Sequence, residues 1–161
     1  MRVALVAFLL LISFARALHA QDEVFIVRHA EKSDAATDEP KNPDLSPAGH
    51  ARAESLARML RDAGITAVYA TEFKRTQQTA EPLARAVGVD VTIVPAQDTS
   101  ALVTHLRETK GSALVVGHSN TIPEIVKALG IDSPIAIGQA DYDNVFVIVG
   151  GSQSRLVRLH Y

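Results

Sequence analysis

The sequence predicts an α/β fold: a three-layer sandwich with a mostly parallel central sheet, helices on both of its faces and an antiparallel hairpin at its C-terminal edge. Short apolar runs alternate with amphipathic stretches of about ten or more residues, which is typical of βαβ units. The last two apolar runs are separated only by a glycine-rich connection, which is typical of a hairpin. With 161 residues, 47% of them hydrophobic and 21% charged, the composition fits a folded domain with one core.

The chain up to residue 64 is predicted to form a strand, a loop and a helix. Val24–Val27 is an apolar run typical of a buried strand, and the polar stretch 32–44 is expected to loop over its end. Ser46 is a favourable N-cap with Pro47 at the first helical position, and Gly64 is a suitable C-cap. The apolar residues expected to share one face of this helix are Ala48, Ala51, Leu56, Met59, Leu60 and Ala63.

Two further strand–helix units follow. Ala67–Ala70 is a short strand, and Thr71 is expected to cap a helix that stops near Gly88. Val91–Val94 is the third strand, and a helix over about Thr99–Glu108 comes after it.

The C-terminal third completes the predicted sheet. Ala113–Val116 is the fourth strand, and a capping box at Thr121–Glu124, with proline inside the first turn, opens a helix that ends near Gly130. Two apolar runs are expected to be the last strands, Asn144–Val149 and Arg155–Tyr161. Gly150–Gln153 is a natural hairpin connection between them.

The first twenty residues differ from the rest. A basic residue precedes the apolar run Val3–Phe14, and small residues follow, which is the pattern of a signal peptide. We expect residues 1–20 to be cleaved after residue 17 or 20, with 21–161 as the single mature domain in the periplasm or outside the cell. An uncleaved N-terminal anchor is the alternative, although the run is short for a membrane-spanning helix.

Charge and cysteine content exclude several functional classes. The formal net charge is −2, and such a surface gives no reason to expect nucleic acid as a partner, or stable membrane association after signal cleavage. The chain has no cysteine, which excludes thiolate zinc sites and cysteine nucleophiles.

Three predicted strand ends carry similar side chains. Arg28 and His29 follow the first strand, Arg75 lies in the opening turn of the helix after the second, and His118 follows the fourth. Because carboxyl ends of parallel strands lie at one edge of a sheet, where ligands bind in open α/β folds, these groups are expected to converge. Two guanidinium groups, two imidazoles and two helix N-termini together predict a phosphate pocket.

Four segments resemble, in the right order, the motifs of the histidine phosphatase superfamily, the phosphoglycerate-mutase-like proteins. They are Val27–Glu31, similar to the RHG/RHA signature; Leu45–Gly49, similar to the LTxxG helix start; Tyr69–Ala80, similar to SxLxRAxxTA; and Val116–Asn120, similar to the late GH motif. The resemblance runs over nearly all of the expected mature chain. Its compactness resembles the short single-domain branch of the family.

The resemblance implies a metal-independent phosphatase without a cofactor, which hydrolyses phosphomonoesters or phosphohistidine through a phosphohistidine intermediate on His29. Arg28 and Arg75 would hold the phosphoryl oxygens, and His118 would contact them from the other side. These roles fit the chemistry, because nearby cations keep an imidazole neutral and stabilise a phosphoryl transition state. The expected partner is a small phosphorylated substrate or a phosphoprotein.

The proton donor of the family has no clear counterpart. Many members have a carboxylate between the equivalents of Arg75 and His118 that protonates the leaving oxygen. Asp98 is the nearest by position, although its place favours a helix N-cap, and Glu31 and Glu72 are substitutes beside the motifs. The absence of an acid would fit a substrate with a good leaving group, such as phosphohistidine or an acyl phosphate.

Two other interpretations stay open. A non-catalytic phospho-ligand binding module on the same fold would need the loss of one of the four pocket residues, and all four are present. A metal-dependent hydrolase could use His29 and Glu31, but no second clustered pair accompanies them. Three histidines lack any motif and are expected to face solvent or pack: His50, His105 and His160. The stretch Tyr142–Asn144 is expected to be a turn.

Overall fold

A computed structural model of the chain describes residues 23–34, 41–150 and 154–161. The predicted signal peptide and most of the hairpin connection lie outside the described residues. Within these ranges the strands are β1 (Glu23–Arg28), β2 (Ile65–Ala70), β3 (Val91–Ile93), β4 (Ser112–Gly117), β5 (Asn144–Val149) and β6 (Arg155–His160). The helices are α1 (Pro47–Leu60), α2 (Lys74–Val87), α3 (Thr99–Glu108) and α4 (Ile122–Ala128).

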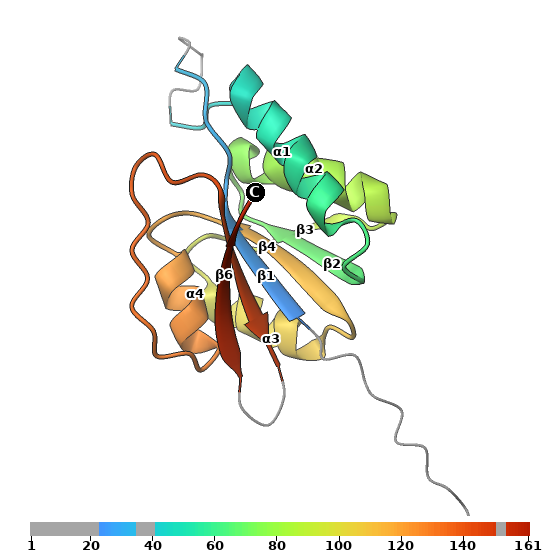
Figure 1. Cartoon of the computed structure of the whole chain (residues 1–161), viewed down its shortest axis with the longest axis vertical. Coiled ribbons are helices and arrows are strands. Elements are labelled where there is room, and N and C mark those ends of the chain that lie inside the picture. The colour runs from blue at the N-terminus through green and yellow to red at the C-terminus, as the bar shows by residue number, and fades with distance from the viewer. Residues whose placement is uncertain (1–22, 35–40, 151–153) are drawn as a thin grey trace, which may run out of the picture.

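The strands form one sheet in the order β3-β2-β4-β1-β5-β6. The four strands from β3 to β1 are parallel, while β5 runs antiparallel to β1 and pairs with β6 as an edge hairpin. Helices α1 and α2 cover one face and α3 and α4 the other (Figure 1). The predicted α/β class, with its mostly parallel sheet and C-terminal antiparallel edge, is confirmed.

The central strands of the sheet contribute side chains to two hydrophobic cores, one on each face of the sheet. In β1, Phe25 and Val27 pack with α1 and α2, whereas Ile26 packs with α3 and α4. This alternation follows from the two-residue period of a strand. Because both faces are covered, β1 is apolar from Val24 to Val27, between the charged residues Glu23 and Arg28 at its two ends.

The inward face of α1 is only partly the predicted one: Leu56 and Leu60 are buried as expected, but the other residues of the face differ. Its buried residues are Gly49, Ala53, Leu56, Ala57 and Leu60, and Met59 is 40% exposed. The reason is a close backbone approach: a Cβ on Gly49 would collide with the carbonyl oxygen of Glu31. Small residues therefore occupy the contact stripe. The helix also ends earlier than predicted, with Arg61 as C-cap, and Gly64 turns the chain into β2 with a φ of 68°.

Of the predicted helix N-caps, two are confirmed and two are wrong. Ser46 accepts a hydrogen bond from the Gly49 amide at the start of α1, and Asp98 accepts one from Ala101 at the start of α3. Thr71 and Thr121 make no side-chain cap for α2 or α4, because their hydroxyls bind His118 instead, Thr71 at the ring Nε2 and Thr121 at the backbone amide. No helix among the described residues has the length and apolar character needed to cross a membrane.

Candidate active site

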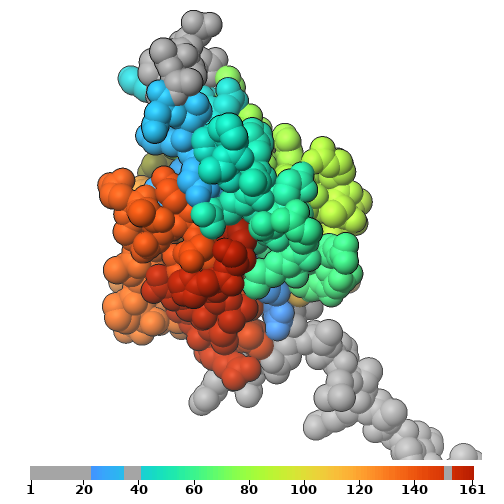
Figure 2. Space-filling model, turned by 45° about the horizontal axis from the view of Figure 1, so that its top comes forward, coloured from blue at the N-terminus to red at the C-terminus, as the bar shows by residue number. Residues whose placement is uncertain are grey.

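The site lies where two neighbouring parallel strands end. Arg28 is the register partner of Gly117, and the His29 amide donates a hydrogen bond to the Gly117 carbonyl at 2.9 Å. His29 and His118 therefore leave the sheet side by side, with their ring centroids 5.4 Å apart. Figure 2 shows the segment after β1 (blue) beside α1 and the loop that precedes β5.

Three of the four residues singled out from the sequence line one open pocket of about 210 Å³: Arg28, His29 and Arg75. The other lining residues are Lys32, Lys41, Pro43, Gln139 and Tyr142. His118 is not among them. Its ring makes edge-on contacts with the rings of His29 and of Phe73, whose centroid is 5.3 Å away. The four side chains nevertheless form one cluster.

His29 is held as a neutral imidazole with a defined tautomer. The residue is 6% exposed, and its Nδ1 lies 2.7 Å from the Ala30 carbonyl oxygen, which can only accept a hydrogen bond. Nδ1 therefore carries the proton and Nε2 keeps its lone pair. Burial, with smaller contributions from Arg75, His118 and Arg28, lowers the pKa of His29 to about 4, while the bond to Ala30 opposes this shift. At neutral pH the ring is therefore uncharged, with a free lone pair on Nε2.

Arg28 is positioned by the loop between α4 and β5. Its Nη1 donates to the carbonyl oxygens of Gly138 and Gln139 at 3.0 Å each, and its guanidinium carbon lies 4.1 Å from the ring centroid of Tyr142. Its Nε is buried and has no hydrogen-bond partner among the described residues. A buried donor without a partner is costly, so an anion at this nitrogen would be favoured.

Arg75 comes from the second position of α2. Its guanidinium carbon lies 4.4 Å from the Phe73 ring centroid, and burial lowers the pKa of Arg75, although a guanidinium still stays charged at neutral pH. Phe73 thus contacts both Arg75 and His118. The aromatic ring packs the first turn of α2 against the strand ends, and this places the second guanidinium beside His29.

Two threonines orient His118. Its Nε2 lies 3.0 Å from the Thr71 hydroxyl, which in turn lies 2.9 Å from the Thr76 hydroxyl. Thr76 donates its one hydroxyl proton to backbone carbonyl oxygen, at 2.7 Å to Phe73. Thr71 must then donate to Thr76 and accept from Nε2–H of His118. Burial and the charge of Arg75 lower the pKa of His118 to about 4.

The backbone of His118 is fixed as well. Its amide donates to the Thr121 hydroxyl at 3.0 Å. Thr71 and Thr121 thus hold His118, whereas the sequence predicted that they would cap helices. No signal in the sequence indicates the contact between Thr71 and His118, because the two residues are 47 positions apart in the chain.

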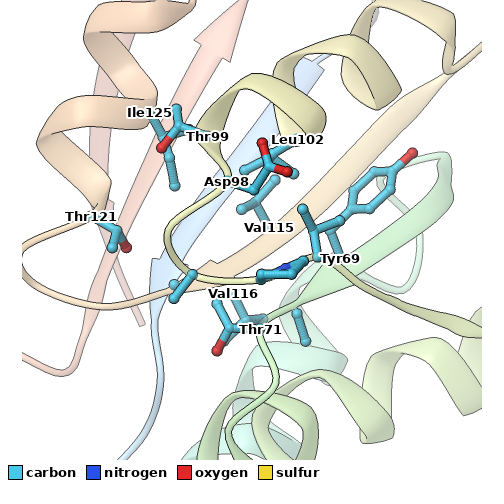
Figure 3. A pocket seen from close by; sticks show the side chains of 14 residues that line it. Tyr69, Thr71, Asp98, Thr99, Leu102, Val115, Val116, Thr121 and Ile125 are labelled. Atoms are coloured by element: carbon cyan, nitrogen blue, oxygen red, sulfur yellow. The ribbon is translucent and has the colours of Figure 1, made fainter.

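None of the three candidate proton donors lines the pocket. Asp98 caps α3 and borders a separate small cavity of about 20 Å³. Thr71 borders the same cavity on the opposite side (Figure 3). Glu31 makes a two-pronged ion pair with Arg52, at 2.7 to 2.9 Å, which lowers the pKa of Glu31. Glu72 is exposed and accepts from the Ala96 amide at 2.8 Å.

The remaining histidines lie away from the pocket, whereas Tyr142 lines it. His50 is exposed on α1, His105 stacks on Tyr69, and His160 lies 3.2 Å from an Asp143 carboxylate oxygen. Tyr142, expected only in a turn, covers Arg28, and its ring centroid lies 6.3 Å from that of His29. No periodicity or motif in the loop before β5 signals this position.

Comparisons with known proteins give one family and one fold. The model of the histidine phosphatase superfamily (branch 1) matches residues 24–98. No curated protein matches the chain. Among solved structures, the protein histidine phosphatase SixA in complex with tungstate shares 20% identity, with a TM-score of 0.67 over 86% of this chain and 96% of that one.

Two further solved structures are similar. A protein assigned as the phosphohistidine phosphatase SixA of Agrobacterium tumefaciens shares 21% identity at a TM-score of 0.65, over 86% of this chain and 98% of that one. A mycobacterial glucosyl-3-phosphoglycerate phosphatase shares 14% identity at a TM-score of 0.67, over 87% and 98%. At these identities the likeness establishes the fold.

Proposed function

We propose that this chain, whose residues 24–98 match the model of the histidine phosphatase superfamily (branch 1), is a member of that superfamily and a metal-independent phosphatase that acts through a phosphohistidine intermediate on His29. Its substrates would be phosphomonoesters or phosphohistidine, carried by a small molecule or a protein. The observation that carries the proposal is the neutral His29, whose Nδ1 is bound to the Ala30 carbonyl while Nε2 keeps its lone pair. A nucleophile in this state needs no prior deprotonation.

The proposed first step is attack of Nε2 on phosphorus. The new P–N bond forms as the bond from phosphorus to the leaving atom breaks, and that atom, the ester oxygen of a phosphomonoester or the ring nitrogen of a phosphohistidine, takes the electron pair. Arg28 would bind phosphoryl oxygens through its unpartnered Nε, and Arg75 would add a second positive charge. An anion beside His118 favours its protonated form, and the Nδ1–H thereby created would donate to a third oxygen.

The proposed second step is hydrolysis of the phosphohistidine. Water attacks phosphorus, the P–N electron pair returns to Nε2, and inorganic phosphate leaves with the oxygen of the water. The same cations stabilise both transition states, because charge spreads over the phosphoryl oxygens in each. Division into two steps replaces one slow displacement by two faster ones.

The leaving group is restricted by the positions of the carboxylates. Neither Asp98 nor Glu31 lines the pocket, and both have partners of their own. Glu72 accepts from the Ala96 amide outside it. We therefore expect the best substrates to be those whose leaving group needs no proton: phosphohistidine, acyl phosphates and aryl phosphates with acidic phenols.

We also propose that the protein is exported, since its first twenty residues have the composition of a signal peptide. N-terminal sequencing of protein purified from the periplasm or medium should find a mature chain that begins at residue 18 or 21. Full-length protein that stays with the membrane fraction would support the anchored alternative instead.

The experiment for the activity is a series of aryl phosphates with phenols of different acidity, assayed with a chelator present. Wild-type protein should release phosphate, fastest from the most acidic phenol, and acid-labile phosphate should be trapped on it. His29→Asn should abolish both, and His50→Asn, at an exposed position of α1, should change neither. Activity lost on chelation would support the metal hydrolase, and vanadate binding without turnover would support the binding module.

A further inference from the structure

The position of the proton on His29 depends on one peptide group. Nδ1 donates to the Ala30 carbonyl oxygen at 2.7 Å, and this bond leaves the lone pair on Nε2. Such hydrogen bonds decide which ring nitrogen carries the proton, and a free histidine side chain prefers the proton on Nε2. The peptide that joins Ala30 to Glu31 must therefore keep its orientation, because a turned carbonyl would release Nδ1–H and the proton would move to Nε2.

Backbone hydrogen bonds hold the chain on either side of this peptide. The Ala30 amide donates to Oγ1 of Thr79 in α2 at 3.0 Å, and the Ser46 amide donates to the Glu31 carbonyl at 2.8 Å. Both bonds involve the neighbouring peptides, however. The peptide in question carries the Ala30 carbonyl and the Glu31 amide, so a group that binds the Glu31 amide would fix its orientation directly.

That group is the carboxylate of Glu31 itself. Hydrogen bonds lower the pKa of the Glu31 carboxyl group, first from Arg52 and, with a smaller effect, from the Glu31 amide, while burial opposes them. The carboxylate thus lies on the N–H side of the peptide whose carbonyl side binds His29. Because hydrogen bonds in a chain polarise one another, the charge of Glu31 also makes the Ala30 carbonyl a better acceptor.

Arg52 of α1 holds this carboxylate in place. Its Nε lies 2.9 Å from each carboxylate oxygen of Glu31, and its Nη2 lies 2.7 Å from Oε1. The two side chains are only 28% and 23% exposed, whereas those of the Arg85–Glu54 pair are 73% and 56% exposed, with nitrogen and oxygen 3.9 Å apart. The guanidinium carbon of Arg52 also lies 5.9 Å from the Tyr161 ring centroid. A half-buried, two-pronged pair holds its members more firmly than an exposed pair does.

We propose that Glu31 and Arg52 are positioning residues for His29: their ion pair holds the Ala30–Glu31 peptide so that the Ala30 carbonyl keeps the proton on Nδ1. The proposal rests on the phosphatase function proposed above. Neither Glu31 nor Arg52 lines the pocket, so the pair reaches the reaction only through His29. The pair should therefore affect kcat, which depends on the nucleophile, and leave KM nearly unchanged.

NMR of the ligand-free protein with ¹⁵N-labelled histidine tests the proton position at pH 7. The His29 signals are identified by their loss in His29→Asn. In wild-type protein they should report a protonated Nδ1 and an unprotonated Nε2. Glu31→Ala should shift His29 toward the form protonated on Nε2, and Glu31→Gln, which keeps one oxygen for Arg52, should have a smaller effect. The matched control is Glu54→Gln/Arg85→Gln, which removes the exposed pair between α1 and α2 and should leave the His29 signals as in wild type.

Hydrolysis of an aryl phosphate tests the consequence for the reaction. Glu31→Gln should lower kcat about tenfold and Glu31→Ala about a hundredfold, with KM within about threefold of wild type. The double variant Glu31→Gln/Arg52→Met should lose no more activity than the worse of its two single variants, because both changes break the same pair. The Glu54→Gln/Arg85→Gln control should keep the wild-type kcat.

The proposal is overturned if wild-type His29 carries its proton on Nε2, or if Glu31→Ala keeps either the wild-type proton position or the wild-type kcat. An equal loss of kcat in the exposed-pair control also overturns it. Circular dichroism and urea unfolding identify the variants that fold, and Glu31→Gln decides the question if Glu31→Ala does not.

The two readouts separate this proposal from the phosphatase function. If the proton position responds to Glu31 as expected but the wild-type protein hydrolyses no aryl phosphate, the pair positions His29 and the phosphatase function fails. If wild-type protein hydrolyses aryl phosphate while the Glu31 variants keep both the proton position and kcat, the protein is a phosphatase and the positioning role fails.

Discussion

Acid should destabilise this fold through the two buried histidines of the site. The pKa values of His29 and His118 are each lowered to about 4 from the ordinary 6.5. As the pH falls below 6.5, the unfolded chain takes up a proton at each histidine while the folded protein does not. Stability rises with pH wherever the unfolded state binds more protons, so the free energy of unfolding must fall on acidification.

The magnitude follows from the two pKa values. Between pH 7 and pH 5, each histidine is expected to remove about 2 kcal/mol from the free energy of unfolding, and the pair about 4 kcal/mol. An ordinary domain has about 5–15 kcal/mol in total. Between pH 7 and pH 5 the ion pair of Glu31 changes the free energy of unfolding little, because Arg52 lowers the pKa of Glu31 and its protonation begins only nearer pH 4.

Urea unfolding at pH 7, 6 and 5 measures this effect. His29→Asn and His118→Asn should each reduce the loss of stability between pH 7 and pH 5 by about 2 kcal/mol, since each removes one titrating group. His50→Asn, at an exposed position, should keep the wild-type pH dependence. If both site variants lose stability on acidification as steeply as wild type, the two imidazoles are not held neutral and the reasoning fails.

Three other substitutions have defined outcomes. Gly49→Ala should lower the free energy of unfolding by about 1–3 kcal/mol in urea, because the new Cβ collides with the Glu31 carbonyl oxygen; an unchanged midpoint would contradict that close approach. Thr71→Val should lower kcat on an aryl phosphate about tenfold by releasing His118, whereas Thr71→Ser should keep it, and equal loss in both would remove the orienting role. Tyr142→Leu should raise KM about fivefold through loss of the ring over the guanidinium; Tyr142→Phe should leave it unchanged, and a Leu variant with wild-type KM would contradict the contact.

The fold was predictable because its signals are local. Each apolar run is bounded by turn residues, and β1 is apolar on both faces because it lies between two helical layers. The buried face of α1 was not predictable in the same way. Met59 is more hydrophobic than Gly49, so hydrophobicity alone selects Met59 for the core, yet Gly49 is the buried residue. What decides the stripe is a backbone contact with Glu31, and no periodicity reveals it.

The same distinction applies to the site. Arg28, His29, Arg75 and His118 were predictable as a cluster because each follows a strand end, and topology brings such ends together. Tyr142 and Lys41 lie in irregular segments whose path depends on tertiary contacts, such as the bonds from Arg28 to the carbonyls of the β5 loop. The hydroxyl of Thr71 matched a local capping rule, but a distant imidazole is its partner.

The place of β1 in the sheet has a consequence for biosynthesis. It is the first strand to leave the ribosome, yet its two neighbours are β4 and β5, whose first residues are 112 and 144. Until those segments are translated, both of its edges lack the partners that they have in the native sheet, and an unpaired apolar strand invites aggregation or chaperone binding. The strand that leads to His29 is thus synthesised early but pairs with its neighbours late, after roughly the last third of the chain has begun to emerge.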